Sequence, residues 1–61
     1  MYTTRFIHKD GQKDEEYWYH TEEEAIAHME LFRNDDSNLY KKIVVVDESE
    51  EIRNFISFDL Q

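Results

Sequence analysis

The sequence predicts an α+β fold, with one helix packed on one face of a mainly antiparallel four-stranded sheet in the order ββαββ. Four segments are rich in β-branched and aromatic residues, as strands are. One segment between the second and third has the apolar spacing of an amphipathic helix. A chain of 61 residues is too short to divide its core in two, so residues 1–61 are predicted to form a single domain.

The first two predicted strands form a hairpin. Residues 2–8 read YTTRFIH, and residues 15–20 read EEYWYH. Between them lies the pair Asp10-Gly11, and both residue types tolerate the positive φ angles of tight turns. The segment YWY has one aromatic face with Tyr17 and Tyr19 and another with Trp18, and the sequence leaves open which of them faces the core.

The predicted helix begins after Thr21. The Thr21 hydroxyl can accept a hydrogen bond from the amide of Glu24, and the three glutamates that follow Thr21 complement the positive end of the helix dipole. Ala25, Met29 and Phe32 then fall at i, i+4 and i+7, with Ile26 beside them, and form a stripe that can pack on a sheet. The helix is expected to end near residues 33–34.

The last two strands follow the turn-forming segment NDDSN. The third strand restarts at residue 39 or 40, and its four consecutive β-branched residues, 43–46, indicate a central strand partly buried on both faces. After the acidic turn ESEE, strict alternation in the last strand predicts two faces. One carries Ile52, Ile56, Phe58 and Leu60, and the other carries Arg53, Phe55, Ser57 and Asp59.

An antiparallel sheet in the strand order 2-1-3-4 satisfies these strand directions, with the helix crossing one face. A single helix covers only one face of a four-stranded sheet, so the other must meet water or a partner. That second face is predicted to carry Phe55, two members of the run 43–46, and either Trp18 or the tyrosines beside it.

Composition and charge narrow the classes of function. The chain is 39% hydrophobic and 15% aromatic with one Gly and no Pro, which indicates a folded protein. Its net charge of −8 disfavours binding to nucleic acid or anionic lipid and favours basic protein surfaces. There is no Cys, no leader-like N-terminus and no long apolar run, so we expect a cytoplasmic protein without disulfides or a membrane span.

Candidate chemical sites are few. His20, Glu24 and His28 are spaced i, i+4 and i+8, but Thr21 as the cap places His20 outside the helix, so no metal site is predicted. The many carboxylates are explained as solvated turns and strand ends. No Gly-rich phosphate loop and no nucleophile beside a base occurs, so neither an enzyme nor a cofactor is expected.

The sequence therefore predicts a small acidic protein-interaction module that associates with itself or docks a partner protein through the uncovered sheet face. The residues predicted to bind the partner are Trp18, Val44, Val46, Arg53 and Phe55. The alternative is a nucleic-acid mimic, whose carboxylates occupy the basic groove of a DNA- or RNA-binding protein. Direct binding of nucleic acid by stacking on Trp18 is not expected, because that platform requires a basic groove.

Overall fold

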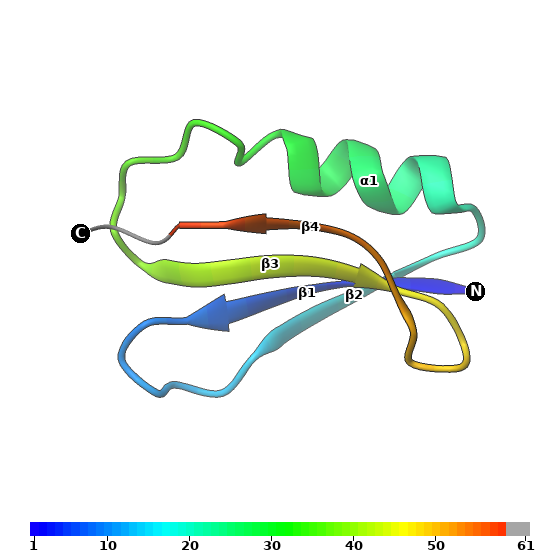
Figure 1. Cartoon of the computed structure of the whole chain (residues 1–61), viewed down its shortest axis with the longest axis horizontal. Coiled ribbons are helices and arrows are strands. Elements are labelled where there is room, and N and C mark those ends of the chain that lie inside the picture. Colours follow the sequence, from blue (N-terminus) through cyan, green and yellow to red (C-terminus); the bar gives the residue numbers. More distant parts are fainter. Residues whose placement is uncertain (59–61) are drawn as a thin grey trace.

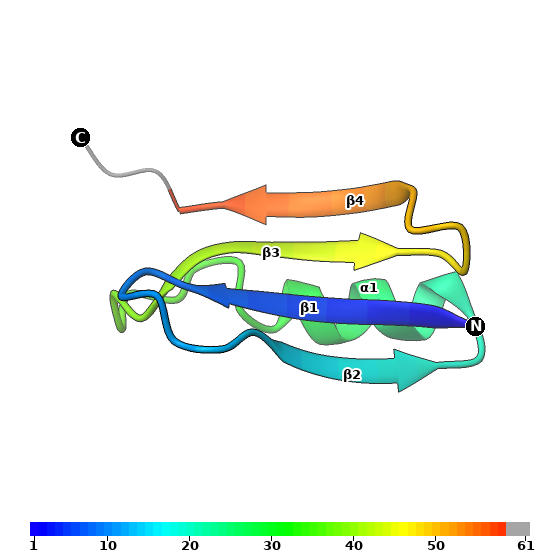
Figure 2. The same ribbon diagram turned by 90° about the horizontal axis from the view of Figure 1, so that it is seen from below.

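The computed structural model describes residues 1–58 and contains one four-stranded antiparallel sheet with one helix across it. The elements are β1 (Tyr2–His8), β2 (Glu15–Tyr19), α1 (Glu22–Glu30), β3 (Tyr40–Val46) and β4 (Ile52–Ser57). The strands lie in the order β2-β1-β3-β4 (Figure 2), with α1 on one side of them (Figure 1). The predicted fold class and strand order are confirmed.

The connection between β1 and β2 is longer than a two-residue hairpin turn. It occupies residues 9–14, and Gly11 has the positive φ of 83° that the turn signal predicted. The Asp10 carboxylate accepts a hydrogen bond from the amide of Gln12 at 3.1 Å. An aspartate side chain that binds the backbone two residues later stabilises this kind of turn.

The helix begins at the predicted cap. Thr21 has extended backbone angles, and its Oγ1 accepts from the amide of Glu24 at 3.1 Å. The Thr21 hydroxyl in turn donates to the Glu24 carboxylate at 3.3 Å. The helix ends at Glu30, earlier than predicted, because the amides of Phe32 and Arg33 bond to carbonyls three residues back rather than four.

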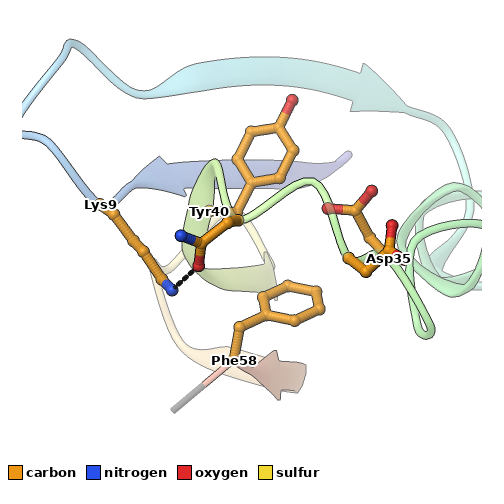
Figure 3. Close-up of a pocket in the computed structure, with 6 residues that line it drawn as sticks. Lys9, Asp35, Tyr40 and Phe58 are labelled. Atoms are coloured by element: carbon orange, nitrogen blue, oxygen red, sulfur yellow. Dashed lines mark hydrogen bonds between the residues drawn. The ribbon is translucent and has the colours of Figure 1, made fainter. Parts of the chain in front are cut away.

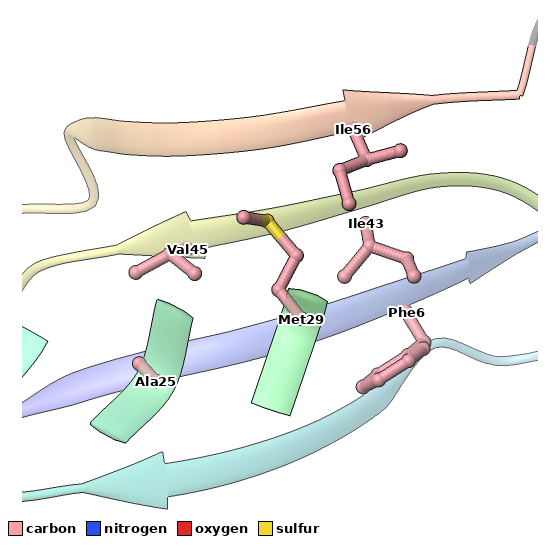
Figure 4. Close-up of a cluster of buried hydrophobic side chains, with 6 residues drawn as sticks. All are labelled: Phe6, Ala25, Met29, Ile43, Val45 and Ile56. Carbon is pink, nitrogen blue, oxygen red and sulfur yellow. The ribbon is translucent and has the colours of Figure 1, made fainter. Parts of the chain in front are cut away.

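The core lies between α1 and the sheet (Figure 4). Ala25 and Met29 of α1 are fully buried, as the helical stripe predicted, and Phe32 and Ile26 pack at its margin. Thr4, the one buried polar residue among residues 1–58, donates its hydroxyl to the Ala25 carbonyl at 2.9 Å. The buried apolar cluster consists of Phe6, Ala25, Met29, Ile43, Val45 and Ile56.

Aromatic rings extend this core toward β2, and they settle the orientation of the YWY segment. Tyr17 and Tyr19 point to the helix side, where both rings contact the ring of His28. His28 Nδ1 is 2.7 Å from the Tyr19 hydroxyl, and its ring also packs against Phe6. Trp18 consequently points to the other side of the sheet, opposite Thr3.

A β-bulge in β4 overturns the predicted alternation of that strand. Val45 lies opposite Asn54 and Val46 lies opposite Ile52, so Arg53 is an extra residue without a partner. Ile52 therefore shares the face of Val46, away from the helix, and Arg53 turns to the helix side, where it reaches Glu22 at 3.7 Å. Phe58 packs against the core as predicted. The predictions for Asp59 and Leu60 fall outside the described residues.

Candidate protein-binding face

The sheet surface opposite α1, here called the open face, is built from two cross-strand rows of side chains. Directly opposed residues of antiparallel strands point to the same side, so the strand register identifies the members of each row. The first row is Trp18, Thr3, Val46 and Ile52, from β2 to β4. The second row is Glu16, Arg5, Val44 and Phe55.

Val44 and Val46 form the floor of the open face. Their exposed fractions are only 4% and 2%, although no helix covers this side. Val44 stands between the longer side chains of Arg5 and Phe55, which cover it. The two valines lie on the predicted face, but the side chains around them leave little of their surface exposed.

The centre of the open face is occupied by a charged side chain. The Arg5 guanidinium forms ion pairs with Glu16 at 2.9 Å and with Glu50, in the β3–β4 turn, at 3.3 Å. Burial lowers the pKa of Arg5, but the hydrogen bonds and charges of the two carboxylates outweigh it, so the pKa is raised. Arg5 therefore stays charged and ties β1 to β2 and to the turn.

Large apolar side chains are exposed on both sides of this charged centre. Trp18 on β2 is 62% exposed, and Ile52 and Phe55 on β4 are each 53% exposed. The Lys42 ammonium lies 5.3 Å from the centre of the Phe55 ring, a cation–π arrangement. Side chains of this kind, exposed around polar groups on one face, are typical of protein-binding surfaces.

Four of the five predicted partner-binding residues lie on the predicted sheet face, and Arg53 does not. Trp18 and Phe55 are exposed on the open face, Val44 and Val46 lie in its floor, and Arg53 lies on the helix side. Ile52 and Arg5, which also lie on the open face, were not among the predicted residues. The adjacent polar residues Arg53 and Asn54 interrupt the apolar alternation of the strand, and they are the signal that would have indicated a bulge.

The β3–β4 turn and the start of α1 lie at the same end of the molecule (Figure 1), and because both are rich in carboxylates we call this region the acidic end. The acidic end contains seven carboxylates. Three positive groups, namely Arg5, Arg53 and the N-terminal ammonium, form ion pairs there, so the net charge of the region is −4. Of the carboxylates, Glu23, Glu24 and Glu51 form no ion pair within residues 1–58. The members of the acidic end are Glu22, Glu23, Glu24, Asp47, Glu48, Glu50 and Glu51.

The three histidines lie in different surroundings within residues 1–58 and do not converge on one site. Thr21 caps α1, so His20 lies outside the helix, and His28 is engaged with Tyr19. His8 pairs instead with Glu15 at 2.9 Å. Among residues 1–58, no three His, Asp or Glu side chains are arranged to hold a metal ion.

Comparison with known proteins adds no further information on function. No protein family, curated protein or solved structure matches the chain. Within the described part of the chain, α1 is the one helix, and it is neither long nor apolar enough to cross a membrane. A proposal for function therefore rests on the surface of the molecule.

Proposed function

We propose that the protein is a small acidic protein-binding module, and that its open face docks a basic surface of another protein. The observation that supports this most is the exposure of Trp18, Ile52 and Phe55 together on one sheet face. Trp is among the residue types that contribute most to binding free energy at protein interfaces. The polar rim is formed by Glu16, Lys42 and Glu50.

The area of the exposed apolar side chains favours a partner that also supplies positive charge. Trp18, Ile52 and Phe55 together expose on the order of 300 Å² of apolar surface. Burying it contributes roughly 7 kcal/mol at about 25 cal/mol per Å², which is comparable to the cost of association. A second copy of the chain would bring another net charge of −8 to the contact, whereas a basic protein adds attraction.

The test is a differential capture experiment with three immobilised proteins: the wild type, a Trp18→Ser/Phe55→Ser variant and a Leu31→Ser control. Leu31 is 80% exposed after α1 and lies outside the open face, so the control removes an exposed apolar side chain elsewhere. A cognate partner should bind the wild type and the control, and the double variant should lose at least about tenfold in affinity. Calorimetry with the purified partner measures that ratio, and raising the salt concentration should weaken the wild-type complex.

Two outcomes would contradict this proposal. If the double variant retains every partner of the wild type at unchanged affinity, the open face is not the binding surface. If sedimentation finds the wild type well above 7.5 kDa and Phe55→Glu near 7.5 kDa, the open face joins two copies of this chain instead of a basic partner.

The nucleic-acid mimic remains a second candidate because of the acidic end. A mimic would bind through carboxylates and would need neither Trp18 nor Phe55. A Glu23→Gln/Glu24→Gln/Glu51→Gln variant would then lose the partner, while the Trp18→Ser/Phe55→Ser variant would keep it. The opposite pattern supports docking through the open face.

A further inference from the structure

A pocket of about 370 Å³ (Figure 3) lies among segments at the end of the molecule opposite the acidic end. The end of β1, the loop after α1, the start of β3 and the residue after β4 surround it. Its volume is within the roughly 300–1,000 Å³ of small-molecule sites. The lining residues are Lys9, Asp35, Asp36, Asn38, Tyr40 and Phe58. We call it the end pocket.

Two aromatic rings of fixed orientation form one part of the end pocket. The Tyr40 ring packs against the rings of Phe6 and His8, with centroids 5.3 and 5.1 Å apart. Phe58 packs against the buried core, and its amide donates to the Lys41 carbonyl at 3.0 Å. These contacts hold the two rings in place before any ligand enters, which lowers the entropic cost of binding.

Two carboxylates form another part of the pocket. Asp35 accepts from the Ser37 hydroxyl at 2.6 Å, and its amide donates to the Phe32 carbonyl at 3.0 Å, so the side chain is positioned by its own loop. Neither Asp35 nor Asp36 forms an ion pair with any residue of the described range.

The lysine in the pocket is held away from these carboxylates. Lys9 donates its ammonium group to the Asn38 side chain, and its amide donates to the Leu39 carbonyl at 2.9 Å (Figure 3). In Figure 3 the rings of Tyr40 and Phe58 lie between Lys9 and Asp35. The pKa of Tyr40 is raised, first by burial and then by the negative charges of Glu15 and Asp35.

We propose that the end pocket binds a guanidinium group, such as that of an arginine side chain, between its rings and its carboxylates. A guanidinium is planar and stacks on aromatic faces, and it donates several hydrogen bonds that match carboxylates. The carboxylates Asp35 and Asp36 disfavour anions and attract a cation that can donate hydrogen bonds to them. This site is separate from the open face and does not depend on the proposed protein-binding function.

The test is a titration of the ¹⁵N-labelled full chain with N-acetyl-arginine amide, followed by amide chemical shifts. We expect saturable binding, with the shift changes concentrated at residues 9, 35–40 and 58. The matched ligand control is the citrulline analogue, which has nearly the same shape without the charge. It should bind about tenfold more weakly or worse, as expected for the loss of a charge-assisted hydrogen bond. Free arginine serves as a second arm and should bind equally if the guanidinium alone is recognised.

Variants make the assignment specific to this pocket. Asp36→Asn should reduce the affinity by about tenfold, whereas Glu23→Gln, which removes the same charge at the acidic end, should leave it unchanged. Lys9→Gln should increase the affinity because it removes a positive charge in the pocket lining that repels the guanidinium. Each variant is first checked for a wild-type melting temperature. If the arginine and citrulline analogues bind equally, or if Asp36→Asn and Glu23→Gln behave alike, the proposal is wrong.

Discussion

The two faces of the sheet are built from the same four strands, but they are covered by different means. On the helix side, α1 buries Phe6, Met29 and Ile43, and the polar group of Thr4 is satisfied by a helix carbonyl. On the open face there is no second layer. Arg5, with its two carboxylates, and Phe55, with Lys42 over its ring, flank Val44, while Val46 lies between Thr3 and Ile52.

This difference assigns different roles to the two faces: the helix side supplies stability, and the open face supplies exposed side chains. Burial of apolar side chains supplies most of the free energy of folding, whereas exposed ion pairs contribute about 1 kcal/mol or less. The helix side is therefore expected to determine stability. The open face can change its side chains with little effect on the fold, which leaves Trp18, Ile52 and Phe55 free to serve binding.

The largest expected effect contrasts one apolar side chain from each face. Met29→Ala should destabilise the protein by roughly 2–5 kcal/mol, because it leaves a cavity under α1. A domain of this size has a total stability of only a few kcal/mol, so the variant is expected to be largely unfolded. Phe55→Ala should cost less, roughly 1–2 kcal/mol, since about half of the Phe55 side chain is already exposed. Urea unfolding followed by circular dichroism measures both, and equal losses would contradict the contrast.

Thr3 and Thr4 are adjacent and lie on opposite faces of the sheet, so the same substitution at each compares the two faces. Thr4→Val should cost about 1–3 kcal/mol, because it removes the buried hydrogen bond to the Ala25 carbonyl. Thr3 lies on the open face, so Thr3→Val should change the free energy of unfolding by less than about 0.5 kcal/mol. Chemical denaturation of the two variants provides the comparison. A Thr4→Val variant as stable as the wild type would show that this bond is not needed.

The cap of α1 tests the attachment of the covering helix itself. Thr21→Ala removes the hydroxyl that accepts from the Glu24 amide, and it should cost on the order of 1 kcal/mol. Thr21→Ser keeps the hydroxyl and should stay within a few tenths of a kcal/mol of the wild type. Urea midpoints distinguish the two variants. If both lose the same amount, the Thr21 hydroxyl is not what stabilises the helix start.

The smallest expected effect concerns the charged cover of the open face. Arg5→Met should cost less than about 1 kcal/mol, because its ion pairs are near the surface and a methionine still covers Val44. Arg5→Ala should cost more, since it also removes the covering stem. At about 1 M NaCl the difference between the wild type and Arg5→Met should shrink. A loss above about 2 kcal/mol for Arg5→Met would mean that the charges, rather than the covering, hold this face.

The elements that follow from local patterns were predicted from the sequence, and those that depend on register between strands were not. The cap at Thr21, the buried stripe of Ala25 and Met29, and the buried run 43–46 each express a short-range preference of the chain. The strand order 2-1-3-4 was predicted because it suits an all-antiparallel sheet with the helix across one face, and the structure has that order. These features could therefore be predicted from the sequence.

The open face could be predicted only in part, because a single bulge changes it. One unpaired residue at position 53 exchanges the sides of Ile52 and Arg53, and a strict two-residue period cannot represent that. The burial of Val44 depends on Arg5 and Phe55, which are distant in sequence and meet it only across the ladder. The covering of Val44 can be predicted only when the residues opposite it on the adjacent strands are known.

The bulge at Arg53 also affects whether the outer strand β4 can pair with a strand of another chain. β2 and β4 are the outer strands, and the unpaired peptide groups of outer strands can template the addition of a further strand, as in fibrils. The bulge and the Arg53 charge interrupt one border, and the other is a five-residue strand that begins with Glu15 and Glu16. Both borders thus resist extension of the sheet, and we expect the protein to resist fibril formation at high concentration.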